Sequence, residues 1–158
     1  MNLSEIARPF VPTRLLAQVR DDGAITCMAG VVLLADLANF TGLTEALTAK
    51  AGADGGELVG RDLNEVLAPA IDAVVRADGD VVKFAGDGLL CIFPRGLEAV
   101  EDACRAGQEI ARATVRGPTG ETHRFRVAIV YGTVLLARVG GHRGRYEFVA
   151  GGEAVDSA

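Results

Sequence analysis

Short apolar runs alternate along this chain with longer segments in which apolar residues recur every three or four positions. Val31–Ala35 is a continuous apolar run of strand length, which predicts a strand covered on both faces. Val81–Phe93 places β-rich residues on either side of an Ala-Gly-Asp-Gly turn, which predicts a hairpin. The three further segments that predict strands are Phe125–Tyr131, Thr133–Val139 and Arg145–Val149.

Helical periodicity marks the segments between these strands. Asn39 is expected to cap a helix whose apolar positions extend to Leu47, and residues 51–56 are expected to form a loop. A longer apolar stripe follows over residues 63–75, with Pro69 inside it, where a proline should kink or split a helix. Residues 97–111 predict another amphipathic helix.

These elements predict one domain and its fold class. Residues 1–28 are expected to form a lead-in with a short helix capped by Thr13, and residues 29–158 to form the domain. The order β-α-α-β-β-α-β, followed by more strands, is typical of an α+β, ferredoxin-like βααββαβ sandwich with helices on one face of an antiparallel-rich sheet. In that topology the first strand lies beside the hairpin.

Composition and charge exclude several classes of protein. Of the 158 residues, 49% are apolar and 23% charged, as in ordinary soluble domains, and the net charge of −5 offers nucleic acid no basic field. No apolar run has the length of a membrane span, and the N-terminus lacks the layout of a signal peptide. Three widely spaced cysteines fit no disulfide or zinc framework, so we expect a cytoplasmic protein. His123 and His142 match no zinc or triad spacing and are expected at the surface.

Two aspartates stand at the ends of apolar strands. Asp36 follows the run Val31–Ala35, and Asp87 lies in the turn of the predicted hairpin. Carboxylates that meet there would repel each other unless a cation bridges them or one takes a proton. Few, hard oxygen ligands suit Mg²⁺ or Mn²⁺. The alternative is that Asp36 only caps the following helix and Asp87 only belongs to a tight turn.

The helix expected after Asp36 offers a seat for phosphate, because the backbone N–H groups of its first turn are free. Enzymes of phosphoryl transfer use metal ions together with such phosphate-binding backbone groups. A polymerase-palm-like nucleotidyl transferase would share the sheet and both aspartates. The low positive charge and the absence of a nucleic-acid surface count against that alternative.

The residues around both aspartates resemble motifs of the class III adenylyl and guanylyl cyclases. Asp36–Thr41 resembles their D-x-x-x-F-T motif, and Lys83–Leu90 resembles their second metal motif, K-x-x-G-D. A Leu-Asn pair at 63–64 and a Gly-Asp pair at 79–80 also fall where that family has them. The K-F-A-G-D sequence and Gly152–Asp156 are most similar to the first catalytic domain of the soluble, bicarbonate-responsive adenylyl cyclase.

This resemblance implies a nucleotidyl cyclase that converts ATP, in preference to GTP, into cyclic AMP and pyrophosphate. Asp36, Asp87 and the carbonyl of Leu37 would bind two Mg²⁺ or Mn²⁺ ions. One ion would activate the ribose 3′-hydroxyl for attack on the α-phosphorus, and the other would hold the triphosphate. The residues implied in phosphate binding are Asn39, Phe40, Thr41 and Arg145, and those implied in a pocket for nucleotide or bicarbonate are Lys83 and Gly86.

The resemblance also predicts that a second cyclase domain completes the site, either a heterodimer-like partner or a second copy. Members of the family carry V-N-x-A-x-R near the end of the domain. Here Asp156 stands at the Asn position, and the Arg position falls beyond Ala158. We therefore expect a C-terminally incomplete domain that supplies the metal half of a site. The alternative is a pseudo-cyclase that serves as a regulatory dimerisation module.

Overall fold

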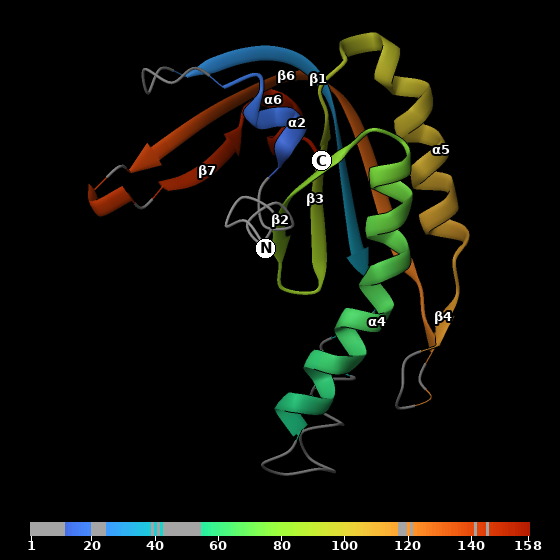
Figure 1. Ribbon diagram of the computed structural model, residues 1–158. Helices are drawn as coiled ribbons and strands as arrows, with labels where there is room; N and C mark the ends of the chain where they lie inside the picture. The colour runs from blue at the N-terminus through green and yellow to red at the C-terminus, as the bar shows by residue number, and fades with distance from the viewer. Residues whose placement is uncertain are drawn as a thin grey trace.

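A five-stranded antiparallel sheet with the strand order β2-β3-β1-β6-β7 forms the framework of the computed structural model (Figure 1). The structure describes residues 12–19, 25–38, 40, 42, 55–116, 120, 122–140, 142–144 and 146–158. In chain order its elements are α2 (Thr13–Leu16), β1 (Thr26–Leu37), α4 (Gly55–Arg76), β2 (Asp80–Ala85), β3 (Gly88–Phe93), α5 (Ala99–Arg112), β4 (Val115–Arg116), β5 (Thr122–His123), β6 (Phe125–Gly140), β7 (Tyr146–Gly151) and α6 (Glu153–Asp156), with 3-10 turns at Gly96–Glu98 and His142–Gly144.

The predicted fold class is confirmed by this topology. Strand β1 pairs with β3, from Val31 opposite Phe93 to Asp36 opposite Gly88, so the first strand does lie beside the hairpin. The order β6-β1-β3-β2, with α4 and α5 as crossover helices, is the ferredoxin-like arrangement. None of the described helices is long and apolar enough to cross a membrane.

Alternation along β1 divides the buried side chains into two clusters. The odd-numbered residues from Val31 to Leu37 pack with α4 and α5. Val32 points the other way, into a cluster that includes Leu15 of α2 and Ala154 of α6. Burial on both sides explains the continuous apolar run. We call the side under α4 and α5 the helix face and the opposite side the α2 face. The predicted cover on both faces of β1 is thus confirmed, with the short helices α2 and α6 on the face where the sequence predicted no helices.

Helix α4 runs from Gly55 to Arg76 and is not split at Pro69. Proline removes the hydrogen bond to the carbonyl four residues earlier, which belongs to Glu65. Both Glu65 and Pro69 are exposed, so water can bind the freed carbonyl. The helix therefore continues, and it also takes in Gly55 and Gly56, which the sequence assigned to a loop.

Strand β6 is a single strand of 16 residues, where the sequence predicted two strands separated at Gly132. Gly132 stays in the ladder, opposite Gly30 of β1. A Cβ on Gly132 would lie 3.3 Å from the Cβ of Ala154 in α6. The glycine therefore marks a close approach of α6 to the sheet, and not the end of a strand.

Helix α2 is held by an aspartate from another element, and not capped by Thr13 as predicted. Pro12 occupies the N-cap position. The buried carboxylate of Asp80, at the start of β2, accepts the backbone N–H of Leu15 at 2.8 Å. Arg14 lies 3.5 Å from the same carboxylate. The lead-in is thereby fixed to the start of β2.

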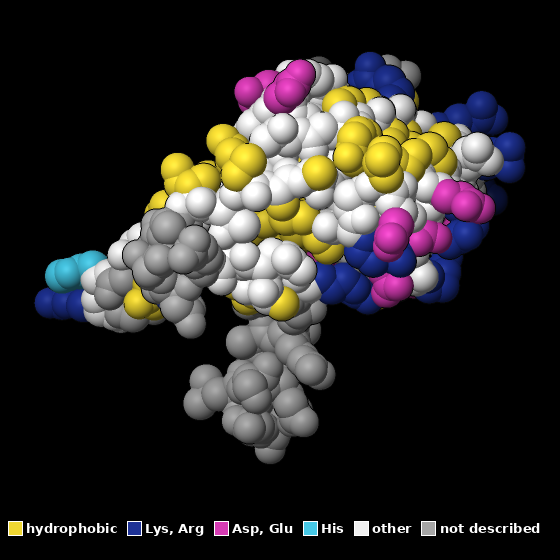
Figure 2. All heavy atoms as spheres, turned by 90° about the horizontal axis from the view of Figure 1, so that it is seen from above, with side chains coloured by type: hydrophobic (Ala, Val, Ile, Leu, Met, Phe, Trp, Pro, Cys, Tyr) yellow, Lys and Arg dark blue, Asp and Glu magenta, His cyan; other side chains and the backbone are white. Residues whose placement is uncertain are grey.

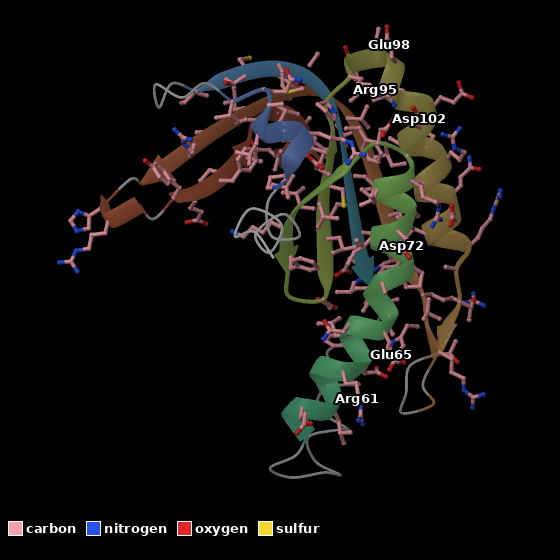
Figure 3. The ribbon with its side chains drawn as sticks, in the orientation of Figure 1. Arg61, Glu65, Asp72, Arg95, Glu98 and Asp102 are labelled. Carbon is pink, nitrogen blue, oxygen red and sulfur yellow. The ribbon has the colours of Figure 1, made fainter. Side chains whose placement is uncertain are left out.

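Charged side chains gather at the end of the sheet where β2 begins and β3 ends. Arg95 forms ion pairs with Asp102 of α5 and with Asp78, which also binds Arg14 at 3.0 Å. The hydrogen bond from Arg95 lowers the pKa of Asp102. Figure 3 shows Arg95 and Asp102 near the start of α5, and Figure 2 shows acidic and basic side chains interleaved at that side. Pairs that reach solvent in this way stabilise a fold little.

Gly107 allows α5 to lie directly against β6. A Cβ on it would lie 2.6 Å from Cδ1 of Ile129 and 3.3 Å from Cγ1 of Val127. We expect Gly107→Leu to lower the free energy of unfolding by about 1–3 kcal/mol, because overpacking pushes the helix off the strand. Urea unfolding measures this, with Gly56→Ala as control, since nothing lies within 4 Å of its Cβ. Superimposable curves for wild type and Gly107→Leu would contradict the tight packing.

Candidate metal and nucleotide site

The strand register brings Asp36 and Asp87 to the same end of the sheet. Asp36 lies opposite Gly88 at the end of the β1–β3 ladder. Asp87 immediately precedes Gly88, in the two-residue turn that joins β2 to β3. The side chain of Asp36 is 37% exposed, and Asp87 is half-buried. Both carboxylates therefore belong to one solvent-accessible edge.

Glycine is needed on either side of Asp87, for a different steric reason at each position. Gly86 has a φ of 65° at the first position of the turn, where a type II′ hairpin requires glycine. At Gly88 the reason is space, because a Cβ there would lie 3.2 Å from the carbonyl oxygen of Ala35 and 3.8 Å from Oδ1 of Asp36. Gly88 thus leaves room beside the carboxylate of Asp36.

Lys83 lies on the same face as Asp36 because of a β-bulge in β2. The register shifts between Val81 and Lys83, so that Lys83 lies opposite Leu90. Without the extra residue, Lys83 would lie opposite Leu89, on the helix face. Leu90 packs in the cluster on the α2 face. Alternation along β1 places Asp36 on that face too.

A half-buried apolar strip extends from Lys83 across the α2 face. Leu90, Leu34 and Ala128 are in register on three adjacent strands, in the row that begins with Lys83. The next row toward the hairpin turn contains Gly88, Asp36 and Arg126. The geometry offers an apolar floor with a cation at either side.

Arg126 is a site residue that sequence reasoning missed. It lies opposite Asp36 in the β1–β6 ladder, and its Nη2 donates to Oδ2 of Asp36 at 2.5 Å. Its side chain is 73% exposed. Among the late arginines, the sequence favoured Arg145, which lies outside the described residues. The sequence places Arg126 at the start of a predicted strand, which could have indicated a site residue. Only the strand register shows that it pairs with Asp36.

The other predicted phosphate and metal contacts are described only in part. Asn39 and Thr41 lie outside the described residues, as does most of the helix predicted to begin at Asn39. Phe40 is half-buried and packs against the cluster on the helix face. Leu37 is 1% exposed in the same cluster. The roles of these residues stay predictions.

The donor set at this edge fits a hard divalent cation. Among the described residues, no three His, Cys, Asp or Glu side chains gather into a metal-binding group. Asp36 and Asp87 thus offer at most a two-carboxylate site. Mg²⁺ is typically held by one or two carboxylates, with waters and substrate phosphates completing its shell, whereas structural zinc needs four protein ligands.

His123 is buried, so the prediction of a surface residue is wrong for it. It is 3% exposed, and its Nε2 lies 2.9 Å from Oδ2 of Asp62, a fully buried residue of α4. Nothing near either residue in the sequence signals this contact, because it joins two distant elements. His142, between β6 and β7, is exposed as predicted.

Comparisons of sequence find adenylate cyclases. No family model matches the chain. Adenylate cyclase type 10 of Rattus norvegicus is 32% identical over 71 residues, which are 44% of this chain and 4% of that protein. The same enzyme of Oryctolagus cuniculus is 27% identical over 134 residues, which are 80% of this chain and 8% of that protein. The chain thus spans less than a tenth of these relatives.

Comparisons of structure decide the fold. A bacterial light-regulated adenylyl cyclase superposes with a TM-score of 0.74 at 18% identity, over 98% of this chain and 46% of that one. A guanylyl cyclase domain from Blastocladiella emersonii superposes with a TM-score of 0.65 at 20% identity, over 83% of this chain and 71% of that one. The chain has the fold of a class III nucleotidyl cyclase domain. These matches confirm the resemblance to class III cyclases that the motifs around Asp36 and Asp87 indicated.

The ion pair between Asp36 and Arg126 contributes little to folding, because both side chains reach solvent. We expect a double-mutant cycle of Asp36→Asn and Arg126→Gln to give a coupling energy below about 1 kcal/mol, smaller still at high salt. Urea unfolding at two salt concentrations measures it, with Arg124→Gln as the control for loss of a neighbouring exposed charge. A coupling of several kcal/mol would show a buried pair instead.

Proposed function

We propose that this chain is the metal-binding half of a nucleotidyl cyclase that, with a second cyclase domain, converts ATP into cyclic AMP and pyrophosphate. The observation that carries the proposal is the register that brings Asp36 and Asp87 to one edge of a cyclase fold. The similarity to adenylate cyclases supports ATP over GTP as the substrate.

In the proposed reaction the ribose 3′-hydroxyl attacks the α-phosphorus and loses its proton, while the bond to the pyrophosphate oxygen breaks. Two Mg²⁺ or Mn²⁺ ions, when bound, lower the barrier by stabilising negative charge on the attacking and leaving oxygens. Asp36 and Asp87 hold these ions through their carboxylates. Arg126, an exposed cation beside Asp36, is placed to bind the triphosphate.

The apolar strip on the α2 face supports nucleotide binding. Leu90, Leu34 and Ala128 are half-buried, so a base or ribose can cover them while their neighbouring cations meet anionic groups. We assign Lys83 to a contact with the nucleotide or with a regulatory anion such as bicarbonate. The further contacts that we carry over from the family resemblance are Leu37 for metal, Asn39, Phe40, Thr41 and Arg145 for phosphate, and Gly86 for the pocket.

A second cyclase domain is proposed as partner because apolar side chains stay uncovered on β6 and β7. Tyr131, Leu135 and Val139 alternate along one face of β6 and are exposed. Val149 of β7 lies opposite Ala137 on that same face and is also exposed. Figure 2 shows hydrophobic side chains at the surface on this side. Exposed apolar patches mark interaction surfaces. The fungal guanylyl cyclase domain has been solved both as a dimer and as a monomer.

We infer a cytoplasmic location from the cysteines. Cys27, Cys91 and Cys104 are all free, and unpaired thiols persist in reducing compartments. Burial, with the nearby charge of Asp80, raises the pKa of Cys91 to about 12, so this thiol stays protonated and unreactive at neutral pH.

Removal of either carboxylate tests the metal site. We expect Asp36→Asn and Asp87→Asn each to lower Mn²⁺ affinity more than about tenfold, since each removes a direct ligand. Isothermal titration with Mn²⁺ and a nonreactive ATP analogue measures this, with Glu65→Gln on α4 as control. Cyclic AMP formation with a complementary cyclase domain should be lost in both variants.

Two outcomes of this titration would contradict the proposal. Unchanged Mn²⁺-dependent binding in the doubly substituted chain would place the metal elsewhere. If the wild-type chain bound neither Mn²⁺ nor the analogue, yet associated with a cyclase domain, the chain would act as a regulatory dimerisation module.

Arg126 should affect metal and nucleotide in opposite directions. In Arg126→Gln we expect Mn²⁺ alone to bind about fivefold more tightly, because the guanidinium no longer competes for Oδ2 of Asp36. The ATP analogue should bind more weakly, because the triphosphate loses a cation. Titrations of Mn²⁺ with and without the analogue separate the two effects, and Arg126→Lys should lie between. Weaker binding of Mn²⁺ alone would rule out the competition.

A further inference from the structure

The buried contact between Asp62 and His123 has no role in the chemistry proposed above. Oδ2 of Asp62 and Nε2 of His123 face each other at 2.9 Å, and their side chains are 0% and 4% exposed. Asp62 lies in the second turn of α4, and His123 is the last residue of β5. The contact therefore joins two elements that are distant in the sequence.

Stability alone does not explain why a buried carboxylate and imidazole are paired here. Burying a carboxylate and an imidazole costs desolvation, and apolar residues of similar volume often serve stability as well or better. What the pair adds is a short, buried contact at 2.9 Å, made without hydrogen-bond geometry, that fixes the distance between α4 and β5. Apolar side chains of the helix-face cluster, including Leu63 next to Asp62, already pack α4 against the sheet.

The pair is connected to the edge that carries Asp36 through the residues that follow His123. The backbone N–H of Ala38 donates to the carbonyl of Arg124 at 2.9 Å, one residue after His123. In the next two steps of the ladder, Leu37 lies opposite Phe125 and Asp36 lies opposite Arg126. A shift of His123 would therefore move the strand that sets the partner of Asp36.

The first half of α4 needs such an anchor. Figure 1 shows that this half extends past the hairpin end of the sheet, and Figure 3 shows Arg61 and Glu65 on it. Both of these residues are exposed, whereas Asp62 between them is fully buried. Asp62 is thus a buried polar residue through which this part of α4 contacts β5.

We propose that Asp62 and His123 are positioning residues, which lock β5 to α4 and thereby hold the start of β6 where Arg126 meets Asp36. The proposal rests on the proposed function only in treating that edge as a metal site. Its structural part, the local ordering of residues 36–38 and 124–126, stands independently of any bound metal.

Amide hydrogen exchange tests the structural part without metal. In Asp62→Asn and in His123→Gln, we expect the Ala38 amide to exchange more than tenfold faster, while amides of the β6–β7 ladder keep their rates. Glu65→Gln, one turn further along α4, should change neither. Equal acceleration throughout the sheet, or none, would overturn the proposal, because the pair would then stabilise the fold generally or do nothing.

A second pair of variants separates position from packing. We expect the doubly substituted Asp62→Leu, His123→Phe chain to unfold at the same urea concentration as wild type or higher, yet to bind Mn²⁺ at least threefold more weakly. Wild-type Mn²⁺ affinity in this variant would overturn the proposal. If the wild-type chain binds no Mn²⁺, the proposed function fails, and the exchange of the Ala38 amide still decides the role of the pair.

Discussion

The antiparallel register of β1 between β3 and β6 is the constraint on which the candidate site depends. Side chains alternate between faces, so a slip of one residue would move every side chain of β1 to the other side. Asp36 would then lie under α4 and α5, and Val31 would leave its cluster. Because that cluster buries the alternate apolar residues of β1 from Val31 to Leu37, their burial specifies the register strongly. The position of the carboxylate is thus fixed by the hydrophobic packing of its neighbours.

Local departures from regular structure gather at the edge that this register defines. The bulge before Lys83 turns the lysine to the α2 face, and Gly86 allows the tight turn before Asp87. Gly88 leaves the space beside Asp36 empty. Together these features keep cationic and anionic groups on one exposed face. Strand ends suit such a site because side chains there reach solvent and need not be apolar.

Buried polar contacts hold the elements that lie around this edge. Asp80 fixes α2 to the start of β2, and Asp62 joins α4 to β5 through His123. Both aspartates link segments that are remote in the sequence, at places where the sheet ladder itself makes no connection. Short buried polar contacts can thus set the position of helices that apolar packing would leave freer to slide.

By itself, the sequence determined the fold class, the hairpin and the two aspartates at strand ends, because apolar runs and turn residues act locally and repeat with the period of their element. The partner of Asp36, the face of Lys83 and the burial of His123 were decided only by the tertiary structure. Arg126 reaches Asp36 across 90 residues through strand pairing, Lys83 turns at a bulge without a sequence signature, and His123 meets a carboxylate from a distant helix. Such contacts depend on register and packing between remote segments, which no local pattern encodes. Gly132 is a further example. From the sequence, a glycine that ends a strand cannot be told from one that lets a helix pack closely, and only the position of α6 distinguishes them.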